Sequence, residues 1–562
     1  MKITLLAMNS SFVHTSLALR TLSCALRADG REVTPLEYTV KDSRTRVLEE
    51  LYATGADVYG FSCYIWNISE LLPLAEELKR LMPHTIIVFG GPEVSFWTRE
   101  ELDLHPFVDF AVTGEGEDAL PSLCRDIENG AAVAKYPDGI VTGGAFRGFE
   151  EQGIPYTEKE ISEGRIVYYE SSRGCPFRCA YCLSSVTSYG DGQKRVRSKS
   201  AQRALDDLMR FESPTSSIRV VKFVDRTFNF DRQRAKEIWR GLLDGKYTKK
   251  YHFEVCASLL DAESLEILSQ APDGKFQLEI GVQSTNPETL RASDRPDDTA
   301  AVLDALRRLR DIPGVHVHAD LIAGLPLESY ESFKRSFDGV FGLCDQLQVG
   351  FLKLLKGCRL REDAEKYGIV FSPRPPYEVL KTDSITFPEL CRLKRVAALV
   401  DRLVSSERFA ASLDFMIRAT QENAPAPSPF EFFESLDEFL GKEVTAISGR
   451  ALYEQMFAYA RSRVKDTDTL REILHRLHYD YLLGESSPIP ASMSVRCEAG
   501  LSPEYVTDKE TKKSLLADAA ANGHTPDSGA TVAVRLCFVD GVVLVDRKNR
   551  VVLTSSEKKS EQ

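Results

Sequence analysis

The sequence predicts an α/β protein with a doubly wound N-terminal domain, a partial barrel and a mainly helical C-terminal region. Short apolar runs alternate with helical stretches in two series, one before residue 135 and one from 166 to 365. After residue 365 this alternation stops and helical periodicity takes over. A chain of 562 residues is long enough for about three or four domains, each with its own core.

The first series predicts a Rossmann-like domain over residues 1–135. Its strand-like runs include KITLLAM, DVYGFSCYI and TIIVFGG, and small or polar residues follow each of them. Ligands of doubly wound sheets bind at the carboxyl ends of the strands, so this domain is predicted to hold a small molecule or a cofactor. Residues 136–165 are rich in turn signals without sustained periodicity, which predicts a linker.

The second series predicts a partial (β/α)6 barrel of the TIM type over residues 166–365. Its six strand-like runs are RIVYYES, IRVVKFVD, YHFEVCA, FQLEIGVQS, VHVHADLIAGLP and LQVGFLKLLK. An active mouth is expected at their carboxyl ends. Residues 366–562 are expected to form a mostly α-helical accessory domain that ends in a β-hairpin around Asp540-Gly541.

Composition limits the classes of partner and location. Lys and Arg total 71 against 83 Asp and Glu, a net charge of −12, which argues against a nucleic-acid partner. No run approaches about 18 apolar residues, and the N-terminus lacks the apolar core of a signal peptide. We therefore expect a cytoplasmic protein without a membrane span.

Three of the twelve cysteines form a cluster. Cys175, Cys179 and Cys182 follow a predicted strand in ESSRGCPFRCAYCLSS, on a loop where three thiolates can converge on one metal centre. The spacing alone leaves open a zinc site that lacks its fourth ligand, or three unrelated thiols.

With the aromatic Tyr181 before its last cysteine, this C-x3-C-x2-C motif resembles that of the radical S-adenosylmethionine (SAM) superfamily. The resemblance implies a 4Fe-4S cluster on Cys175, Cys179 and Cys182, whose open iron binds SAM. It further implies reductive cleavage of SAM to a 5'-deoxyadenosyl radical inside a partial barrel. An electron donor such as flavodoxin or ferredoxin, and sensitivity to oxygen, follow from the same resemblance.

The strand ends of the barrel resemble the cofactor contacts of this superfamily. The SAM-contacting residues that the resemblance implies are Tyr181, Asp225, Glu279, Gln283, Ser284, Ile322 and Gly324. An Asp such as Asp225 at the end of a strand could equally cap a helix. His316 and His318 alternate on one predicted strand and point the same way, which we expect to be inward.

The first domain resembles the cobalamin-binding domain that often precedes this barrel. The cobalamin contacts that the resemblance implies are Asn9, His14, Ser16, Ser62, Gly90, Gly91, Pro92, Glu93, Gly114, Glu115 and Gly116. The base-off type of this domain has Asp-x-His-x-x-Gly in its first loop, and the stretch around His14 lacks both the Asp and the Gly. His14 is therefore an axial ligand of cobalt, a loop contact or a helix-start residue. The C-terminal region is similar to an uncharacterised domain of the DUF4080 type.

This combination predicts a cobalamin-dependent radical SAM enzyme that methylates an unactivated carbon of an unknown substrate. Radical rearrangement, cyclisation or ring contraction on the same scaffold stays open as an alternative. A tRNA methylthiotransferase would need three more cluster cysteines in its first domain, whereas Cys24, Cys63 and Cys124 stand singly. A non-enzymatic cobalamin sensor or an iron-sulfur electron carrier is the remaining class.

Overall fold

The computed structural model describes the chain except residues 165, 188–195, 296–297, 422–425, 442–443, 486–488, 491–492, 494–500, 522–530, 540, 549–550 and 556–562. It divides into two compact units, one of residues 1–330 and 350–386 and the other of residues 331–349 and 387–562. None of the helices in the described part is both long and apolar enough to cross a membrane.

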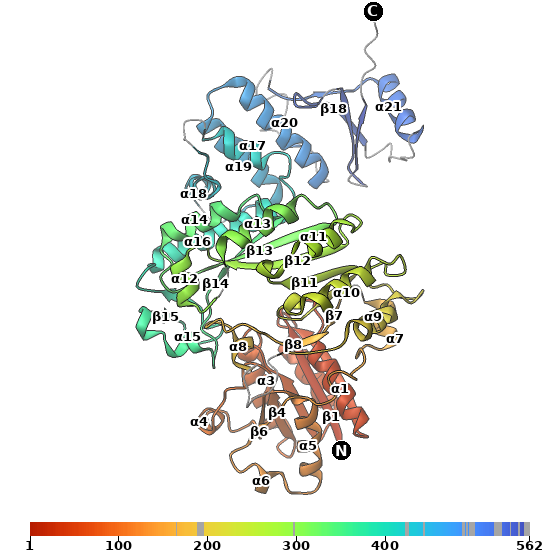
Figure 1. The fold of residues 1–562 in the computed structure, drawn as a ribbon, viewed down its shortest axis with the longest axis vertical. Coiled ribbons are helices and arrows are strands. Elements are labelled where there is room, and N and C mark those ends of the chain that lie inside the picture. The colour runs from red at the N-terminus through yellow and green to blue at the C-terminus, as the bar shows by residue number, and fades with distance from the viewer. Residues whose placement is uncertain are drawn as a thin grey trace, which may run out of the picture. The chain divides into compact units, whose positions relative to one another are not determined.

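The first unit begins with a parallel six-stranded sheet in the order β2-β1-β3-β4-β5-β6 (Figure 1). Its strands are β1 (Lys2–Asn9), β2 (Glu32–Thr39), β3 (Val58–Ser62), β4 (Ile86–Gly90), β5 (Phe110–Thr113) and β6 (Ile140–Thr142). The predicted Rossmann-like architecture is confirmed. The last strand, β6, lies in the stretch that the sequence predicts as a linker, and it pairs with β5.

Each face of this sheet is covered by its own helices and its own core. In β1, alternate residues enter different cores: Leu5 and Ala7 pack with α1 (Leu17–Ala28) and α5 (Gly116–Glu128), whereas Leu6 packs on the other side. The second core includes residues of α2 (Arg44–Thr54) and α3 (Ile68–Leu81). Both faces of β1 are therefore buried, which leaves the ends of the strands for ligands.

The barrel follows, and all six of its predicted strands are present. They are β7 (Ile166–Tyr169), β10 (Val220–Phe223), β11 (Lys250–Val255), β12 (Phe276–Gln283), β13 (Val315–Ala323) and β14 (Gln346–Phe351), in the spatial order β14-β13-β12-β11-β10-β7. The helices α9 (Ala201–Met209), α10 (Arg232–Leu242), α11 (Ala262–Ser269), α12 (Pro287–Ala292) and α13 (Thr299–Arg310) connect them. Spatial order follows chain order, as in an open barrel.

Along β12 and β13, fully buried residues alternate with partly exposed ones. The buried set is apolar and includes Leu278 and Val317. The partly exposed set is mostly polar and includes Glu279 and His318, which are register partners. One face of the sheet therefore packs on the helices, while the other presents polar groups to the barrel interior.

The second unit is mainly helical, as predicted. Its helices are α14 (Tyr330–Val340), α16 (Phe387–Val400), α17 (Leu413–Ala419), α18 (Pro429–Leu440), α19 (Gly449–Arg463), α20 (Thr467–Gly484) and α21 (Lys509–Ala521). The predicted hairpin strands are β18 (Thr531–Arg535) and β19 (Val542–Asp546), which pair antiparallel. They belong to a four-stranded sheet with β17 (Glu504–Tyr505) and β20 (Val551–Ser555), and Asp540 lies outside the described residues.

Candidate functional site

The three clustered cysteines lie on a loop that opens directly after a short strand, β8 (Ser172–Gly174), which pairs with β9 (Val196–Ser198). Gly174 has a φ of 105°, a value that side chains rarely allow, and it turns the chain into the loop. The hydroxyl of Ser185 donates to the carbonyls of Cys179, at 3.0 Å, and of Cys182, at 2.6 Å. The loop is therefore held by its own hydrogen bonds.

The spacing of the three sulfurs fits a cluster better than a single ion. A tetrahedral zinc ion with sulfur ligands at about 2.3 Å needs sulfurs about 3.8 Å apart. Among the described residues, the three cysteines are not a group whose ligand atoms all lie within 4.8 Å, so at least two of the sulfurs are farther apart. Three thiols spread over one loop match the donor set of a 4Fe-4S cluster with one open corner.

Arg295, which the sequence analysis missed, lies beside this loop. Its Nη1 is 3.9 Å from Sγ of Cys179 and 3.5 Å from the hydroxyl of Tyr181. Burial raises the pKa of the Cys179 thiol, and the charge of Arg295 acts in the opposite direction. The guanidinium also donates to the carbonyl of Gly281 on β12. Arg295 therefore joins the cysteine loop to the barrel wall.

Asp225, at the end of β10, is fully buried and caps no helix. Its carboxylate accepts hydrogen bonds from the backbone N–H of Ser171, at 2.8 Å, and from the hydroxyls of Ser171 and Ser172, at 2.5 and 2.7 Å. Burial raises the pKa of Asp225, and the charge of Arg234 opposes this. Asp225 thus fixes the turn between β7 and β8, which leads into the cysteine loop.

The other SAM candidates lie on β12 and β13 or just beyond them. Gln283 ends β12 with a φ of 67° beside a shift in register, and Ser284 follows it, buried. Such irregularities re-aim side chains at the rims of barrels. Ile322 and Gly324 lie at the end of β13, where Gly324 has a φ of 88°. Glu279 lies lower in the barrel wall, with its Oε2 3.0 Å from Nε2 of His252.

In the first domain, the loop after β1 carries three of the cobalamin candidates. The amide of Asn9 donates to the carbonyl of His14 and to the carboxylate of Glu37, each at 2.9 Å. Ser16 caps α1 by accepting from the N–H of Leu19. The exposed ring of His14 has its Nδ1 2.6 Å from the hydroxyl of Tyr168 on β7, so this loop touches the barrel.

The glycines among the candidates allow close approaches of backbone. Gly91 has a φ of 108°, and a Cβ there would lie 2.7 Å from the carbonyl oxygen of Cys63. Gly114 has a φ of 75°, and its Cβ would lie 2.5 Å from the carbonyl oxygen of Gly143. Gly90 ends β4 beside Ser62, which ends β3. Exposed Pro92 follows, so these loops form one edge of the sheet.

Two acidic candidates tie this edge to the rest of the unit. Buried Glu93 accepts a hydrogen bond from the hydroxyl of Tyr377 and lies 3.8 Å from Nζ of Lys356. Glu115, just before Gly116 opens α5, forms ion pairs with Arg173, at 2.8 Å, and with Arg197. Both arginines lie on the β8–β9 hairpin that flanks the cysteine loop.

Aromatic side chains at the same edge were not identified from the sequence. Tyr64 and Trp66, in the loop after β3, stack with ring centroids 4.3 Å apart, and Trp66 is 46% exposed. Phe12, in the loop after β1, is 87% exposed. Exposed apolar area at the carboxyl edge of a doubly wound sheet suits a large, flat cofactor. The donor and apolar groups present therefore fit a corrin.

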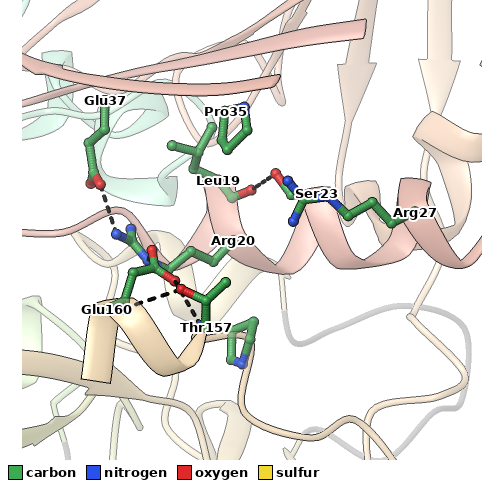
Figure 2. Close-up of a pocket in the computed structure, with 9 residues that line it drawn as sticks. Leu19, Arg20, Ser23, Arg27, Pro35, Glu37, Thr157 and Glu160 are labelled. Atoms are coloured by element: carbon green, nitrogen blue, oxygen red, sulfur yellow. Dashed lines mark hydrogen bonds and ion pairs between the residues drawn. The ribbon is translucent and has the colours of Figure 1, made fainter. Parts of the chain in front are cut away.

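A cavity of about 240 Å³ lies away from the cysteines, beside α1 and α7 (Glu158–Glu163) (Figure 2). Arg20 crosses it and forms ion pairs with Glu37, at 2.9 Å, and with Glu160, at 2.8 Å. Glu160 is also part of the capping box of α7 with Thr157. Arg27, which also lines the cavity, donates to the carbonyl of Val33. Because these charged groups already have partners, we interpret the cavity as a structural contact region between α1 and α7.

Two histidines that the sequence places on one helix, His475 and His478, have separate structural partners. Nε2 of His478 is 2.5 Å from the carbonyl of Met493, and its Nδ1 is 2.9 Å from the hydroxyl of Tyr505. Nδ1 of His475 accepts from the N–H of Cys537. The two rings are therefore anchored in the core of the second unit.

Three family models match successive parts of the chain. The B12 binding domain model matches residues 3–124, the radical SAM superfamily model residues 169–339, and the model of a protein of unknown function, DUF4080, residues 365–524. The chain therefore contains a B12-binding domain, a radical SAM domain and a DUF4080 domain. The radical SAM domain implies a 4Fe-4S cluster and SAM, and the B12-binding domain implies cobalamin. Such a protein needs a reductant and a substrate.

Similar proteins include named methyltransferases. The 2-(S-pantetheinyl)-carbapenam-3-carboxylate methyltransferase of Streptantibioticus cattleyicolor is 25% identical over 52% of this chain and 45% of its own length. The hopanoid C-3 methylase of Methylococcus capsulatus is 27% identical over 55% of this chain and 60% of its own length. This B12-binding radical SAM chain thus spans about half the length of these relatives.

A solved structure shares the fold of this radical SAM chain. It is that of the apo form of the cobalamin-dependent S-adenosylmethionine radical enzyme OxsB, with a TM-score of 0.58 and 15% sequence identity. The match covers 85% of this chain and 78% of that one. The likeness supports the arrangement of a Rossmann-like domain followed by a partial barrel.

Proposed function

We propose that the protein is a cobalamin-dependent radical SAM methyltransferase that acts on an unactivated carbon. The observation that carries this proposal is the ion pair between Glu115 and Arg173. It joins the carboxyl edge of the B12-type sheet to the residue two positions before Cys175. A corrin at that edge would therefore lie next to the cysteine loop. The curated relatives named above are methylating enzymes, which favours methyl transfer over rearrangement.

In this proposal Cys175, Cys179 and Cys182 hold the 4Fe-4S cluster. The SAM contacts are Tyr181, Asp225, Glu279, Gln283, Ser284, Ile322 and Gly324. The cobalamin contacts are Asn9, His14, Ser16, Ser62, Gly90, Gly91, Pro92, Glu93, Gly114, Glu115 and Gly116. His14 is either a loop contact or an axial ligand in this scheme, because Nδ1 of its ring is 2.6 Å from the Tyr168 hydroxyl and Nε2 is left for cobalt.

When bound, the cluster and SAM supply a carbon radical that abstracts hydrogen, and the corrin supplies the methyl group. The residues of the chain bind and orient these groups. Asp225 acts through Ser171 and Ser172 to fix the start of the cysteine loop. Arg295 holds Cys179 and Tyr181 against β12. The reductant in this proposal is a flavodoxin or a ferredoxin.

The deciding experiment is anaerobic. The full chain is reconstituted with iron, sulfide and hydroxocobalamin and desalted, and its absorption spectrum is recorded. SAM and a reductant are then added, and 5'-deoxyadenosine is measured. Retained corrin together with 5'-deoxyadenosine supports the proposal. Cleavage of SAM without retained corrin would leave a radical SAM enzyme but remove methyl transfer, and retained corrin without cleavage would favour a sensor.

A further inference from the structure

A second group of potential metal ligands lies inside the barrel, apart from the cysteines. His252 on β11, Glu279 on β12 and His318 on β13 each place one ligand atom within 4.8 Å of the other two. Within the described part of the chain, no other three His, Cys, Asp or Glu residues meet this criterion. Zinc ligands at about 2.0–2.1 Å lie about 3.3 Å apart, so a small inward movement would close the group around one ion.

Strand register brings these three residues together. Glu279 and His318 are direct partners in the β12–β13 pair, and Glu279 pairs with Glu254 in the β11–β12 pair. His252 stands two residues before Glu254 on the same face of β11. The three side chains therefore project from adjacent strands of a rigid wall, as ligands of a preorganised site do.

His252 provides an independent sign of a missing ligand. Its side chain is only 5% exposed, its Nε2 lies 3.0 Å from Oε2 of Glu279, and its Nδ1 makes no hydrogen bond to any described residue. A buried polar group without a hydrogen bond costs about 1–3 kcal/mol. A metal ion bound to this ring would satisfy it.

His318 has the side-chain amide of Gln277 beside one ring nitrogen, 2.6 Å from its Nε2. Metal binding at Nδ1 would place the ring proton on Nε2, with the amide turned so that its oxygen accepts. Neutral imidazole is the species that coordinates metal.

Carboxylates and cations both surround the group. Glu254 and Asp320 face the same interior as Glu279, and Arg226 interacts with Glu254 and Arg295 with Asp320. Oδ1 of Asp320 has no hydrogen-bond partner among the described residues. Lys222 is the cation that interacts with both Glu279 and His318. A divalent ion would relieve the repulsion among these carboxylates.

We propose that His252, Glu279 and His318 bind a divalent transition-metal ion in the interior of the barrel, as a site separate from the cluster, and that Glu279 is a ligand of this ion rather than a SAM contact. Two imidazoles and one carboxylate are a donor set typical of catalytic zinc and of non-haem iron(II). Three protein ligands leave a coordination position for water or for an oxygen atom of a substrate. Metal binding here does not depend on the proposed methyl transfer.

The test uses the reconstituted full chain, in which the cysteines already carry the cluster, and zinc as the probe. The protein is incubated with Zn²⁺ and desalted, and zinc, iron and corrin are measured per chain. Wild type is expected to retain about one zinc, and X-ray absorption at the zinc edge is expected to show nitrogen and oxygen ligands at about 2.0–2.1 Å. A shell of sulfur at about 2.3 Å, or no retained zinc, would overturn the proposal.

Variants of the three ligands locate the ion. His252→Ala, His318→Ala and the near-isosteric Glu279→Gln should each lower zinc retention at least about tenfold, with iron and corrin unchanged. His316→Ala is the matched control, because His316 is two residues from His318 on the same face of β13 and lies outside the group. Zinc retention that survives all three ligand variants, or that falls equally in His316→Ala, would refute the assignment.

Discussion

The guanidinium of Arg173 lies 2.8 Å from the carboxylate of Glu115. This ion pair connects the β8–β9 hairpin, which flanks the cysteine loop, to the carboxyl edge of the first sheet. Arg173 also pairs with Glu117 and Glu170, each at 2.7 Å, and its side chain is only 19% exposed. One cation thus neutralises three carboxylates of limited exposure. Its removal would leave them to repel one another.

Replacement of Arg173 should therefore destabilise the first unit and weaken its hold on the corrin. Loss of one partner of a buried ion network costs about 3 kcal/mol, which corresponds to a fall of about 5 °C in melting temperature. We expect this for Arg173→Gln, measured by thermal unfolding of the apo chain, together with reduced corrin after desalting. Arg46→Gln is the control, since Arg46 is 63% exposed in its pair with Glu50. Equal melting temperatures for the two variants would contradict this role.

The close approach at Gly91 gives a second prediction. Gly91→Ala would strain a backbone with a φ of 108° and place a Cβ 2.7 Å from the carbonyl oxygen of Cys63. We expect a loss of stability of about 2 kcal/mol or more and a weaker retention of cobalamin, both measured on the full chain. Gly30→Ala is matched to it, because Gly30 has a φ of 80° in open space. Its cost should be about 1 kcal/mol with corrin retained. If Gly91→Ala lost no more stability and no more cobalamin than Gly30→Ala, the close approach of Gly91 to the carbonyl of Cys63 would not be what constrains this position.

Periodicity was sufficient to predict both α/β series, because strands such as β12 and β13 are long and place an apolar residue at every second position. The strand β6 is not predicted from the sequence. It has only three residues, between Gly139 and Gly143, and is too short to show a recognisable pattern. The hairpin of β18 and β19 was predicted from its turn, but its place in a four-stranded sheet depends on pairings between distant segments.

The site was less predictable than the fold. The cysteine spacing is local, so it is visible in the sequence, whereas the meeting of His252 with Glu279 depends on strand pairing. From the sequence, Asp225 is either a cofactor contact or a helix cap. In the structure its carboxylate accepts hydrogen bonds from the hydroxyls of Ser171 and Ser172, a role that the sequence does not indicate. No local signal marks Arg295, because its contacts come from the fold of the loop after α12.

Removal of one cluster cysteine should abolish binding of the iron-sulfur cluster without affecting binding of cobalamin. We expect Cys179→Ala to lose the cluster and all 5'-deoxyadenosine formation, because two thiolates cannot hold the four-iron cube, while corrin binding by the first domain persists. Iron and sulfide analysis, corrin absorbance and product assay on the same sample measure this. Cys391→Ala, on α16 of the second unit, is the control and should keep all three signals. Full cluster content in Cys179→Ala would exclude Cys179 as a ligand.

Protonation of His478 should lower the stability of the second unit on mild acidification, whereas buried Asp480 on the same helix, whose pKa is raised to about 6, acts in the opposite direction. The ring is fully buried, and burial lowers its pKa to about 4 from an unperturbed value of 6.5. Between these two values the unfolded chain binds more protons than the folded one, so stability falls as the pH drops from about 6.5 toward 4. The loss at pH 5 amounts to about 2 kcal/mol.

Calorimetry of the full chain at pH 7.5 and pH 5.0 tests this relation. The His478→Gln variant should be less stable at pH 7.5, because it loses packing and the Tyr505 hydrogen bond, but its transition should shift less between the two pH values than that of wild type. His84→Gln, at an exposed position of the first unit, should keep the wild-type shift. If His478→Gln and wild type shift equally, protonation of this buried ring is not what weakens the unit in acid.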